Sequence, residues 1–477
     1  MKKILSIITL GIIVVSGIGS GTLLQHNELD QQTSMLGKYQ MVIISPNDFT
    51  DELQPLIDHK NTVGIHTILK TTEEIYPEYE GRDEAEQIKY CIKEMIELYD
   101  IQYVLLVGGR IGQSFQWYIP PRYSHIDDGF MHKEFLSDLY FADIYKENGE
   151  FEDWDSNENN IFSEWYDDEA EPQDNMDLKP DVALGRLPCR NEQEVETVVN
   201  KIIQYEQNTF GQAWFKKALL IGGDTNPGVG DPFPLEGEAD CTYTAQLLNE
   251  YSITTLFISD GSLTDPNDVI SSFNQGYGFV LFHGHGLQDS LFTHTLEGEK
   301  LPIFHSDNIS ELSNLNMYPI MVVGCCVTTE FDVGILNFIQ IFKNLQQHHH
   351  FQTWKYECVS DVLGWNLIKK QDGGTIAYIG DSSTSWGVSG DENNDGIPDS
   401  VHDGLTSGLC AEFFRNIGNG TMDTIGMVFK NTVRNILDSY TGSEPRIHCK
   451  NVQEFQLLGD PSLKIGGYQE IYKMNTS

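Results

Sequence analysis

Short apolar runs alternate with amphipathic stretches through the first half of the chain. The runs YQMVIIS, VGIHTIL and QYVLLVGG have the length and composition of strands. Between them, FTDELQPLIDHKNT places Leu53, Leu56 and Ile57 on one face of a helix, and EAEQIKYCIKEMIELYD has the same helical period. Strands that are apolar throughout are typical of a parallel sheet covered by helices on both faces. The pattern therefore predicts an α/β subdomain over residues 39–208.

A second series of the same kind follows over residues 213–468. Its apolar runs are LLIGGD, ITTLFIS, FVLFHGHG, IMVVGCC and IAYIGD, and ADCTYTAQLLNEY is expected to form a helix between the first two. His283 and His285 come at the end of one predicted strand, and Cys325 and Cys326 at the end of the next. Open α/β sheets bind ligands at the carboxyl ends of their strands. We therefore predict an α/β fold with two parallel-sheet subdomains, and a site where the two pairs meet.

The first residues follow a different pattern. Lys2 and Lys3 precede an apolar run from Ile4 to Val15, and small residues continue to Gly21. This order is typical of a secretory signal peptide over residues 1–21, which predicts a secreted, extracellular protein. If the segment is not cleaved, it is the predicted tether to a membrane, since no later run is long and apolar enough to cross one.

The charge of the chain excludes one class of partner. Its 477 residues include 71 Asp and Glu against 30 Lys and Arg, a net charge of -41. Phosphate groups are repelled by such a surface, so nucleic acid is not an expected partner. The excess of carboxylates suits an extracellular medium in which salt screens them or calcium binds them.

The histidine and cysteine pairs suggest nucleophilic catalysis. The reactive form of cysteine is the thiolate, and a neighbouring imidazole both favours it and later protonates a leaving amine. Glycines on either side of His285 allow the backbone to approach a reacting carbonyl. The N–H of Gly286, with that of the cysteine, is a candidate oxyanion hole. A strand-end His-Gly followed by a strand-end Cys is the chain order of caspase-like folds.

Two other interpretations remain open. A zinc metallohydrolase using the His-x-His pair normally has Asp two residues after the second histidine, where this chain has Leu287. The run His348 to His350 binds zinc at most adventitiously, because it lies in a polar segment. We expect no catalytic metal and no organic cofactor. A non-catalytic surface protein with a peptidase fold is the other alternative, which the presence of both His285 and Cys326 disfavours.

Several blocks in the same order resemble the gingipain-type cysteine peptidases of clan CD, family C25. They are GHG, VVGCCVTTEFD, GTIAYIGDSSTSWG, FQLLGDPSLKI and PDVALGRLPCRNEQE, within residues 38–465. The resemblance implies a caspase-like second subdomain with helices on both faces and a secreted endopeptidase acting on proteins or peptides. Its catalytic cysteine is then Cys326 rather than Cys325, and its base His285 rather than His283.

The same resemblance implies further site residues. The acid that orients the imidazole is expected at Asp224, with Asp231 and Glu236 as rivals, and Ser385 and Trp386 are expected to line the substrate cleft. The lysine-specific type has acids after Ser-Trp-Gly, where this chain has Val388 and Ser389. The family's preference for basic residues is therefore not expected to transfer to this chain.

Two acidic loops are predicted to bind calcium. The first, DENNDGIPDS, has the start of an EF-hand-like loop, with Gly396 at the sharp turn. Its predicted ligands are Asp391, Asn393, Asp395, the Ile397 carbonyl and Asp399. The second, DSNENNIFSE, has Asn160 in the glycine position, with predicted ligands Asp155, Asn157, Asn159 and Glu164. Calcium bound in either loop is expected to be structural, since a ligand that binds the folded state stabilises it.

Overall fold

The computed structural model describes residues 37–129, 134–228, 233–339, 358–402, 405–440, 442 and 444–469. The predicted signal peptide, Asp231 and the three consecutive histidines lie outside these ranges. Among the described residues, no helix combines the length and the apolar character needed to cross a bilayer.

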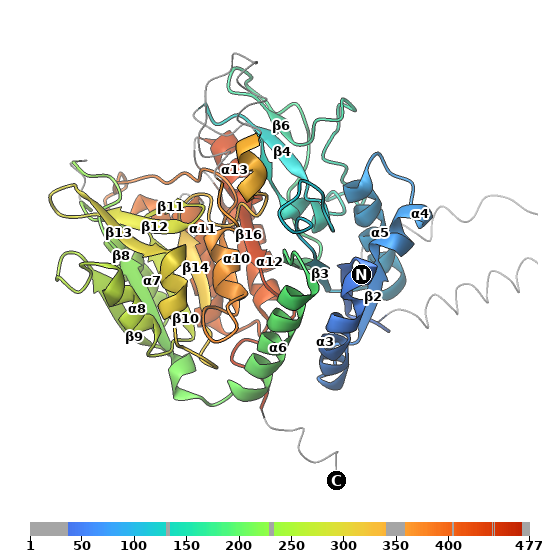
Figure 1. Ribbon diagram of the computed structural model, residues 1–477. Coiled ribbons are helices and arrows are strands. Elements are labelled where there is room, and N and C mark those ends of the chain that lie inside the picture. Colours follow the sequence, from blue (N-terminus) through green and yellow to red (C-terminus); the bar gives the residue numbers. More distant parts are fainter. Residues whose placement is uncertain are drawn as a thin grey trace, which may run out of the picture.

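One sheet of ten strands runs through the whole molecule (Figure 1), in the order β2-β1-β3-β7-β16-β15-β14-β10-β8-β9. The strands of the first half are β1 (Met41–Ser45), β2 (Thr67–Thr71), β3 (Tyr103–Val107) and β7 (Ala183–Leu187). Those of the second half are β8 (Lys217–Gly222), β9 (Ser252–Phe257), β10 (Phe279–His283), β14 (Ile320–Gly324), β15 (Ala377–Asp381) and β16 (Phe455–Leu458). Every residue of β1 and β10 is buried, as expected for strands covered on both faces.

The last strand among the described residues, β16, joins the two halves. β16 lies parallel to β7 and antiparallel to β15, whereas all other neighbouring strands of the large sheet are parallel. The two parallel groups therefore run in opposite directions within one sheet. The predicted α/β class is confirmed. That the two series share one sheet was not predicted, and the boundary between residues 208 and 213 stays a prediction.

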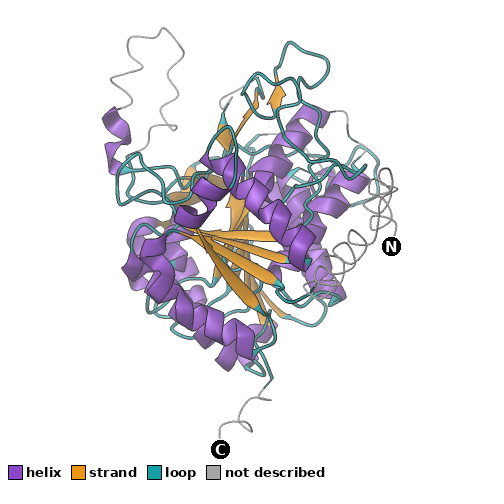
Figure 2. Cartoon of the chain, turned by 90° about the vertical axis from the view of Figure 1, so that its right-hand side faces the viewer, coloured by secondary structure: helices purple, strands orange, loops and turns teal. Residues whose placement is uncertain are grey.

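Helices cover both faces of this sheet (Figure 2). Their bounds are α3 (Thr50–Thr62), α4 (Thr72–Glu78), α5 (Glu84–Tyr99), α6 (Glu192–Asn208), α7 (Glu236–Leu247), α8 (Pro266–Phe273), α10 (Leu363–Ile368), α11 (Thr406–Asn419), α12 (Ile425–Ser439) and α13 (Pro445–Glu454). Leu53, Leu56 and Ile57 of α3 are buried, as their spacing predicts. The Asn191 side chain accepts a hydrogen bond from the Glu194 N–H, which caps α6.

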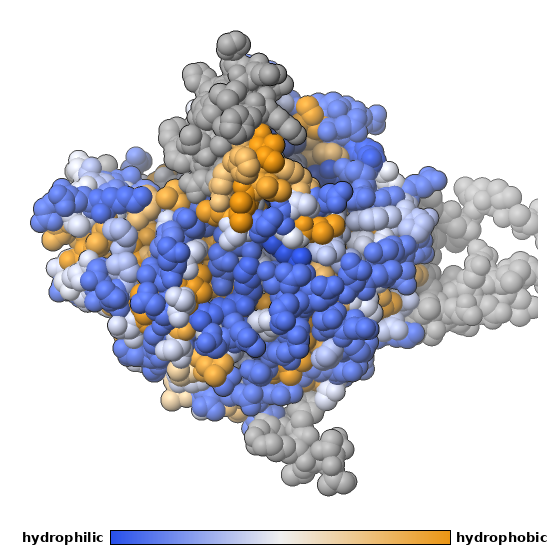
Figure 3. All heavy atoms as spheres, viewed as in Figure 1, coloured by the Kyte–Doolittle hydropathy of each residue, from blue (hydrophilic) through white to orange (hydrophobic). Residues whose placement is uncertain are grey.

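Two small sheets flank the large one and were not predicted. The first is the antiparallel sheet of β11 (His285–Leu287), β12 (Ser290–His294) and β13 (Lys300–His305). The second consists of β4 (Tyr123–Ile126), β5 (Phe135–Leu136) and β6 (Glu164–Trp165). The face of the molecule in Figure 3 is mostly hydrophilic, as the excess of acidic residues leads one to expect.

A buried ion cluster ties α3, α6 and the end of β16 together. The ammonium of Lys60 lies 2.8 Å from Glu206 and 2.7 Å from Asp460, and all three side chains are fully buried. Burial alone lowers the pKa of Lys60, but the two carboxylates outweigh it and the pKa is raised. Such a paired lysine resists replacement, because its loss leaves two buried carboxylates without their cation.

Candidate active site

The register of the sheet brings His285 and Cys326 to one edge. His283 is the last residue of β10 and pairs with Gly324, the last residue of β14. His285 and Cys326 each follow these paired residues by two positions, so both segments leave the sheet at the same level. His285 then begins β11, and Cys326 enters the loop after β14.

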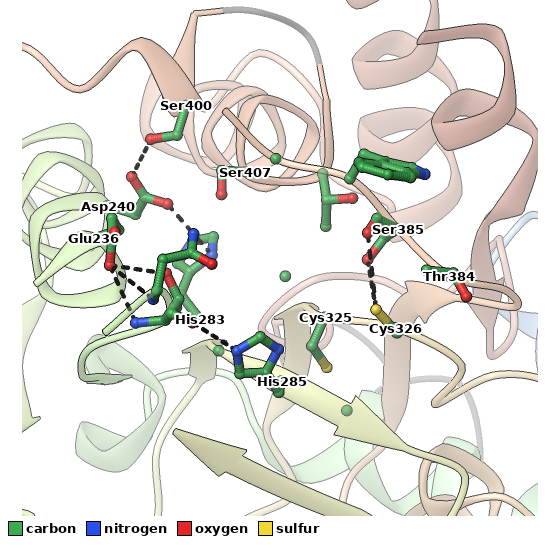
Figure 4. A pocket seen from close by; sticks show the side chains of 18 of the residues that line it. Glu236, Asp240, His283, His285, Cys325, Cys326, Thr384, Ser385, Ser400 and Ser407 are labelled. Atoms are coloured by element: carbon green, nitrogen blue, oxygen red, sulfur yellow. Dashed lines mark hydrogen bonds and ion pairs between the residues drawn. The ribbon is translucent and has the colours of Figure 1, made fainter. Parts of the chain in front are cut away.

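A pocket of about 560 Å³ lies beyond this edge (Figure 4). It is lined by both predicted pairs and by Gly286, Ser385 and Trp386. Further lining residues that the sequence did not single out are Thr225, Asn226, Asp240, Thr384, Ser400, Thr406 and Ser407. Figure 4 shows Glu236, Asp240 and Ser400 on one side, with Cys326, Ser385 and Thr384 on the other and His285 at the base.

The thiol of Cys326 contacts Ser385. Its Sγ lies 3.8 Å from the Ser385 carbonyl oxygen, and the Ser385 hydroxyl donates to Sγ at 3.6 Å. Burial raises the pKa of Cys326, so the thiol is protonated at neutral pH in this arrangement. Cys325 is only 2% exposed, and burial raises its pKa well above the ordinary value. Of the two thiols, Cys326 is therefore the accessible one. All eight cysteines of the chain, each within the described residues, are free thiols.

The imidazole of His285 is fixed by a backbone carbonyl and by an aromatic ring. Nε2 donates to the carbonyl oxygen of Thr225 at 2.8 Å, and the ring stacks on Phe292 with centroids 4.9 Å apart. Burial lowers the pKa of His285, so the neutral ring predominates at pH 7. Because Nε2 carries the hydrogen, Nδ1 is the nitrogen with the free lone pair. Nδ1 is therefore the atom able to act as a base.

Asp224 does not have the orienting hydrogen bond that was predicted for it. The Thr225 carbonyl takes the hydrogen of His285, and the carboxylate oxygen Oδ1 of Asp224 is buried without a hydrogen-bond partner. The backbone oxygen of Asp224 instead accepts from the N–H of His294 and the hydroxyl of Thr293. Asp224 lies beside the site, but the tautomer of His285 is set by the carbonyl of Thr225, the residue that follows Asp224. A backbone carbonyl has no residue-type signal, which is why the sequence did not reveal it.

Glu236, the rival acid, accepts hydrogen bonds from the loop that carries the Thr225 carbonyl. Its Oε2 accepts the Thr225 N–H at 3.1 Å, the Thr225 hydroxyl at 3.0 Å and the Asn226 N–H at 3.4 Å. Glu236 is the first residue of α7, so its carboxylate lies at the positive end of the helix dipole. The loop that binds His285 is thus held by a charged acceptor.

Gly286 lies where the histidine and cysteine segments touch. A Cβ at this position would be 2.3 Å from the Cys326 carbonyl oxygen and 2.8 Å from Cys325 Sγ. Such distances exclude any side chain, so only glycine lets the two segments approach this closely. The approach puts the backbone of Gly286 beside Cys326; the oxyanion role of its N–H stays a prediction.

The family model for peptidase family C25 matches residues 35–466. The chain belongs to peptidase family C25. The resemblance seen in the motifs is therefore confirmed.

Relatives of this C25 chain are distant in sequence. Gingipain R2 of Porphyromonas gingivalis is 22% identical over 436 residues, covering 89% of this chain and 46% of the relative. Lys-gingipain HG66 of the same organism is 23% identical over 224 residues, covering 44% of this chain and 10% of the relative. The C25 chain thus spans less than half the length of these curated relatives.

Solved structures show the same fold. The Arg specific cysteine proteinase gingipain R matches with a TM-score of 0.60 at 18% identity, over 90% of the C25 chain and 78% of that chain. A complex of the pro- and mature domains of Porphyromonas gingivalis RgpB matches with a TM-score of 0.59. At this identity the likeness establishes the architecture of the C25 chain and nothing finer.

The first predicted calcium loop of the C25 chain has its side-chain oxygens directed inward. Asp391 accepts from the N–H groups of Asp395 and Gly396, both at 3.0 Å, and Asp395 accepts from the Ile397 N–H. Asn393 accepts from Asp395 as well. Gly396 has φ +80°, which the sharp turn requires. The loop is exposed and contains the oxygen ligand types that calcium takes. A ninth-position acid, Asp399, bonds the Glu392 N–H at 2.9 Å.

The second predicted loop fits a calcium ion less well. Asp155 accepts from Asn159 and Asn160 in the same pattern, but its Oδ2 also lies 2.6 Å from the Arg82 guanidinium. The amide groups of Asn157 and Asn159 donate to Glu164. The predicted ligands do come together, but the Arg82 guanidinium already supplies the positive charge beside Asp155. We therefore do not propose a calcium ion in this loop.

A carboxylate cluster that the sequence did not indicate lies near this second loop. Oxygens of Asp143, Glu152 and Asp177 lie within 4.8 Å of one another. Burial raises the pKa of Asp143 well above its ordinary value and lowers that of nearby Lys89 to about 8. Lys89 is the compensating cation, and the group belongs to the core of the first half.

Proposed function

We propose that this chain is a cysteine endopeptidase in which Cys326 is the nucleophile and His285 the general base. The observation that carries the proposal is the accessible thiol of Cys326 and the oriented imidazole of His285 on one pocket of a C25 chain. Proteins and peptides are the proposed substrates, because a thiol and an imidazole at the end of an open pocket suit attack on an amide carbonyl.

The proposed reaction begins when the Cys326 side chain rotates away from Ser385 toward His285. Nδ1 takes the thiol proton as Sγ attacks the scissile carbonyl, and the backbone N–H groups of Gly286 and Cys326 are proposed to bind the oxyanion. The protonated imidazole then gives that proton to the leaving amine. Water, deprotonated by His285, hydrolyses the thioester and restores the thiol.

The test of the proposal uses the wild-type protein. Purified chain is expected to cleave an unfolded protein such as reduced casein, and a single iodoacetamide adduct at Cys326 is expected to stop cleavage. Peptide mapping by mass spectrometry identifies the modified residue. Cleavage that continues after complete alkylation of Cys326 would contradict the proposal.

Against the expectation drawn from Val388 and Ser389, we also propose that the pocket prefers a positively charged P1 side chain. Asp240 lines it and is only 3% exposed, bonded to the Ser400 hydroxyl and 3.8 Å from His283. Burial lowers the pKa of His283, so that ring is neutral at pH 7. The described lining residues include no lysine or arginine. A buried carboxylate without a cation is costly, and a basic substrate side chain supplies one. The solved neighbour gingipain R is described as Arg specific.

Calcium binding in the loop of residues 391–399 is proposed as a stabilising feature. The melting temperature is expected to be higher in calcium than in EGTA, by an amount that corresponds to about 2.7 kcal/mol at 100 times the Kd. Asp391→Asn is expected to abolish the difference, because it removes one of the charged ligands. Glu164→Gln, in the second loop, is the matched control and should leave the difference unchanged. Equal melting temperatures in calcium and EGTA would rule the site out.

Export from the cell is proposed from the N-terminal pattern of Lys2, Lys3 and the apolar run that follows. Excess acidic charge and the exposed calcium-type loop both suit an extracellular medium. Mass spectrometry of protein recovered from culture medium tests this, since a mature N-terminus near residue 22 is expected.

A further inference from the structure

The segment Thr384–Trp386 forms one wall of the pocket and has no regular secondary structure. It follows β15, and each of its three residues lines the pocket. Few backbone hydrogen bonds hold it: the Thr406 N–H donates to the Trp386 carbonyl at 3.2 Å, and the Val327 N–H donates at 2.9 Å to the carbonyl of Ser383, which directly precedes the segment. An irregular segment with few backbone bonds needs other support if it is to have one conformation.

Two buried side chains of α13 supply that support. Lys450 Nζ donates to the Thr384 carbonyl, and Asn451 Nδ2 donates to the Trp386 carbonyl at 2.9 Å. Both residues are 0% exposed. The two ends of the wall are therefore fastened to consecutive residues of one helix.

Lys450 also acts on the Trp386 ring through Asp128. Its ammonium lies 3.5 Å from Asp128 Oδ2, and the same oxygen accepts the indole N–H of Trp386 at 3.1 Å. Glu454 Oε2, at 2.7 Å, is the second carboxylate on Lys450. Replacing a buried ion pair by well-packed apolar residues is often neutral or stabilising, so net stability alone does not account for this network. Here the network reaches both the backbone and the ring of the pocket wall.

We propose that Lys450 and Asn451 are positioning residues that hold the Thr384–Trp386 wall in the conformation that receives substrate. The inference rests on the proposed peptidase function. Neither residue lines the pocket. Their loss is expected to weaken substrate binding while the chemistry at Cys326 with small reagents continues, because an alkylating agent does not need the wall.

The test compares Lys450→Met and Asn451→Leu with Lys201→Met. Lys201 is a matched control: it is also a buried lysine, and it donates to the carbonyls of Ile368, Lys370, Gly373 and Thr375. Those carbonyls precede β15, whereas the wall follows it, so Lys201 acts at the opposite edge of the sheet. Measurements are KM and kcat on a peptide, the iodoacetamide rate at Cys326, and the melting temperature.

Lys450→Met and Asn451→Leu are expected to raise KM about tenfold or more, a loss of binding of the size expected for one buried polar contact. Their alkylation rates at Cys326 should change by less than KM does, because Ser385 of the wall contacts the thiol but the small reagent does not bind the wall. Lys201→Met should lower the melting temperature and leave KM unchanged. Lys450→Arg, which keeps the charge, should recover part of the loss.

A wild-type KM in folded Lys450→Met and Asn451→Leu would overturn the inference, and so would an equal rise of KM in Lys201→Met. If Lys450→Met does not fold, Asn451→Leu decides, because it leaves no buried charge unpaired. Failure of the peptidase proposal has a different signature: the wild-type chain itself would not cleave peptides.

Discussion

Cys326→Ala is expected to lower kcat/KM for peptide hydrolysis by at least about 10⁴-fold, since removal of a covalent nucleophile leaves only binding and polarisation. Cys325→Ala is the neighbouring comparison and should lose at most about 100-fold, the cost of a small misplacement of the reacting groups. Its thiol is 2% exposed, and burial raises its pKa further from neutrality. Continuous fluorescence assays with a quenched peptide measure both variants.

The pH dependence of alkylation gives a second readout of the same assignment. Burial raises the pKa of Cys326 above its ordinary value of 9.0, so the iodoacetamide rate should still be rising at pH 9. Burial lowers the pKa of His285, so the base stays unprotonated below pH 6.5 and hydrolysis should persist there. A Cys325→Ala protein that loses activity as fully as Cys326→Ala would contradict the choice of nucleophile.

Asp240→Asn is expected to lower kcat/KM for peptides with Arg or Lys at P1 by about 30- to 1000-fold. The range follows from the cost of removing one partner of a buried charge pair. Peptides with an apolar P1 residue should be cleaved as well as before or better, because the pocket then has one buried charge fewer. Parallel kinetics on a matched set of peptides that differ only at P1 give the ratio.

Glu238→Gln is the control for this variant. Glu238 lies on the same helix α7 and is 7% exposed, but it bonds Ser259 and does not line the pocket. The substitution also neutralises a buried acid of α7 and should leave the P1 preference unchanged. If Asp240→Asn cleaves basic and apolar peptides with the wild-type ratio, the specificity proposal is wrong.

The positions of His285 and Cys326 could be predicted because they depend on short-range pattern. Each follows an apolar run, and parallel strands place their carboxyl ends at one edge of a sheet. The glycines beside His285 were also informative, because two segments that approach this closely require glycine, and glycine is visible in the sequence.

The other walls of the pocket depend on contacts between distant segments, which a single sequence does not show. Asp240 is on α7, which begins at Glu236, whereas the apolar pattern placed the helix start at Ala239. Because the predicted helix lacks the first turn of α7, the sequence did not show that Glu236 and Asp240 lie one turn apart and face the same pocket. The Thr225 carbonyl has no side-chain signature. Lys450 contacts the pocket wall only because the fold places α13 next to the Thr384 carbonyl. The sequence pattern predicts two sheets rather than one for a similar reason, because β16, the strand that joins them, follows both series in the chain.

The central place of β16 has a consequence for the order of synthesis. β7 and β15 have no direct pairing with each other, and both pair with residues 455–458. A nascent chain that ends before residue 455 therefore lacks the strand that joins the two parallel groups. α13, which immediately precedes β16, is completed at the same time as the junction between the halves. One continuous segment, residues 445–458, thus completes both the pocket wall and the joined sheet.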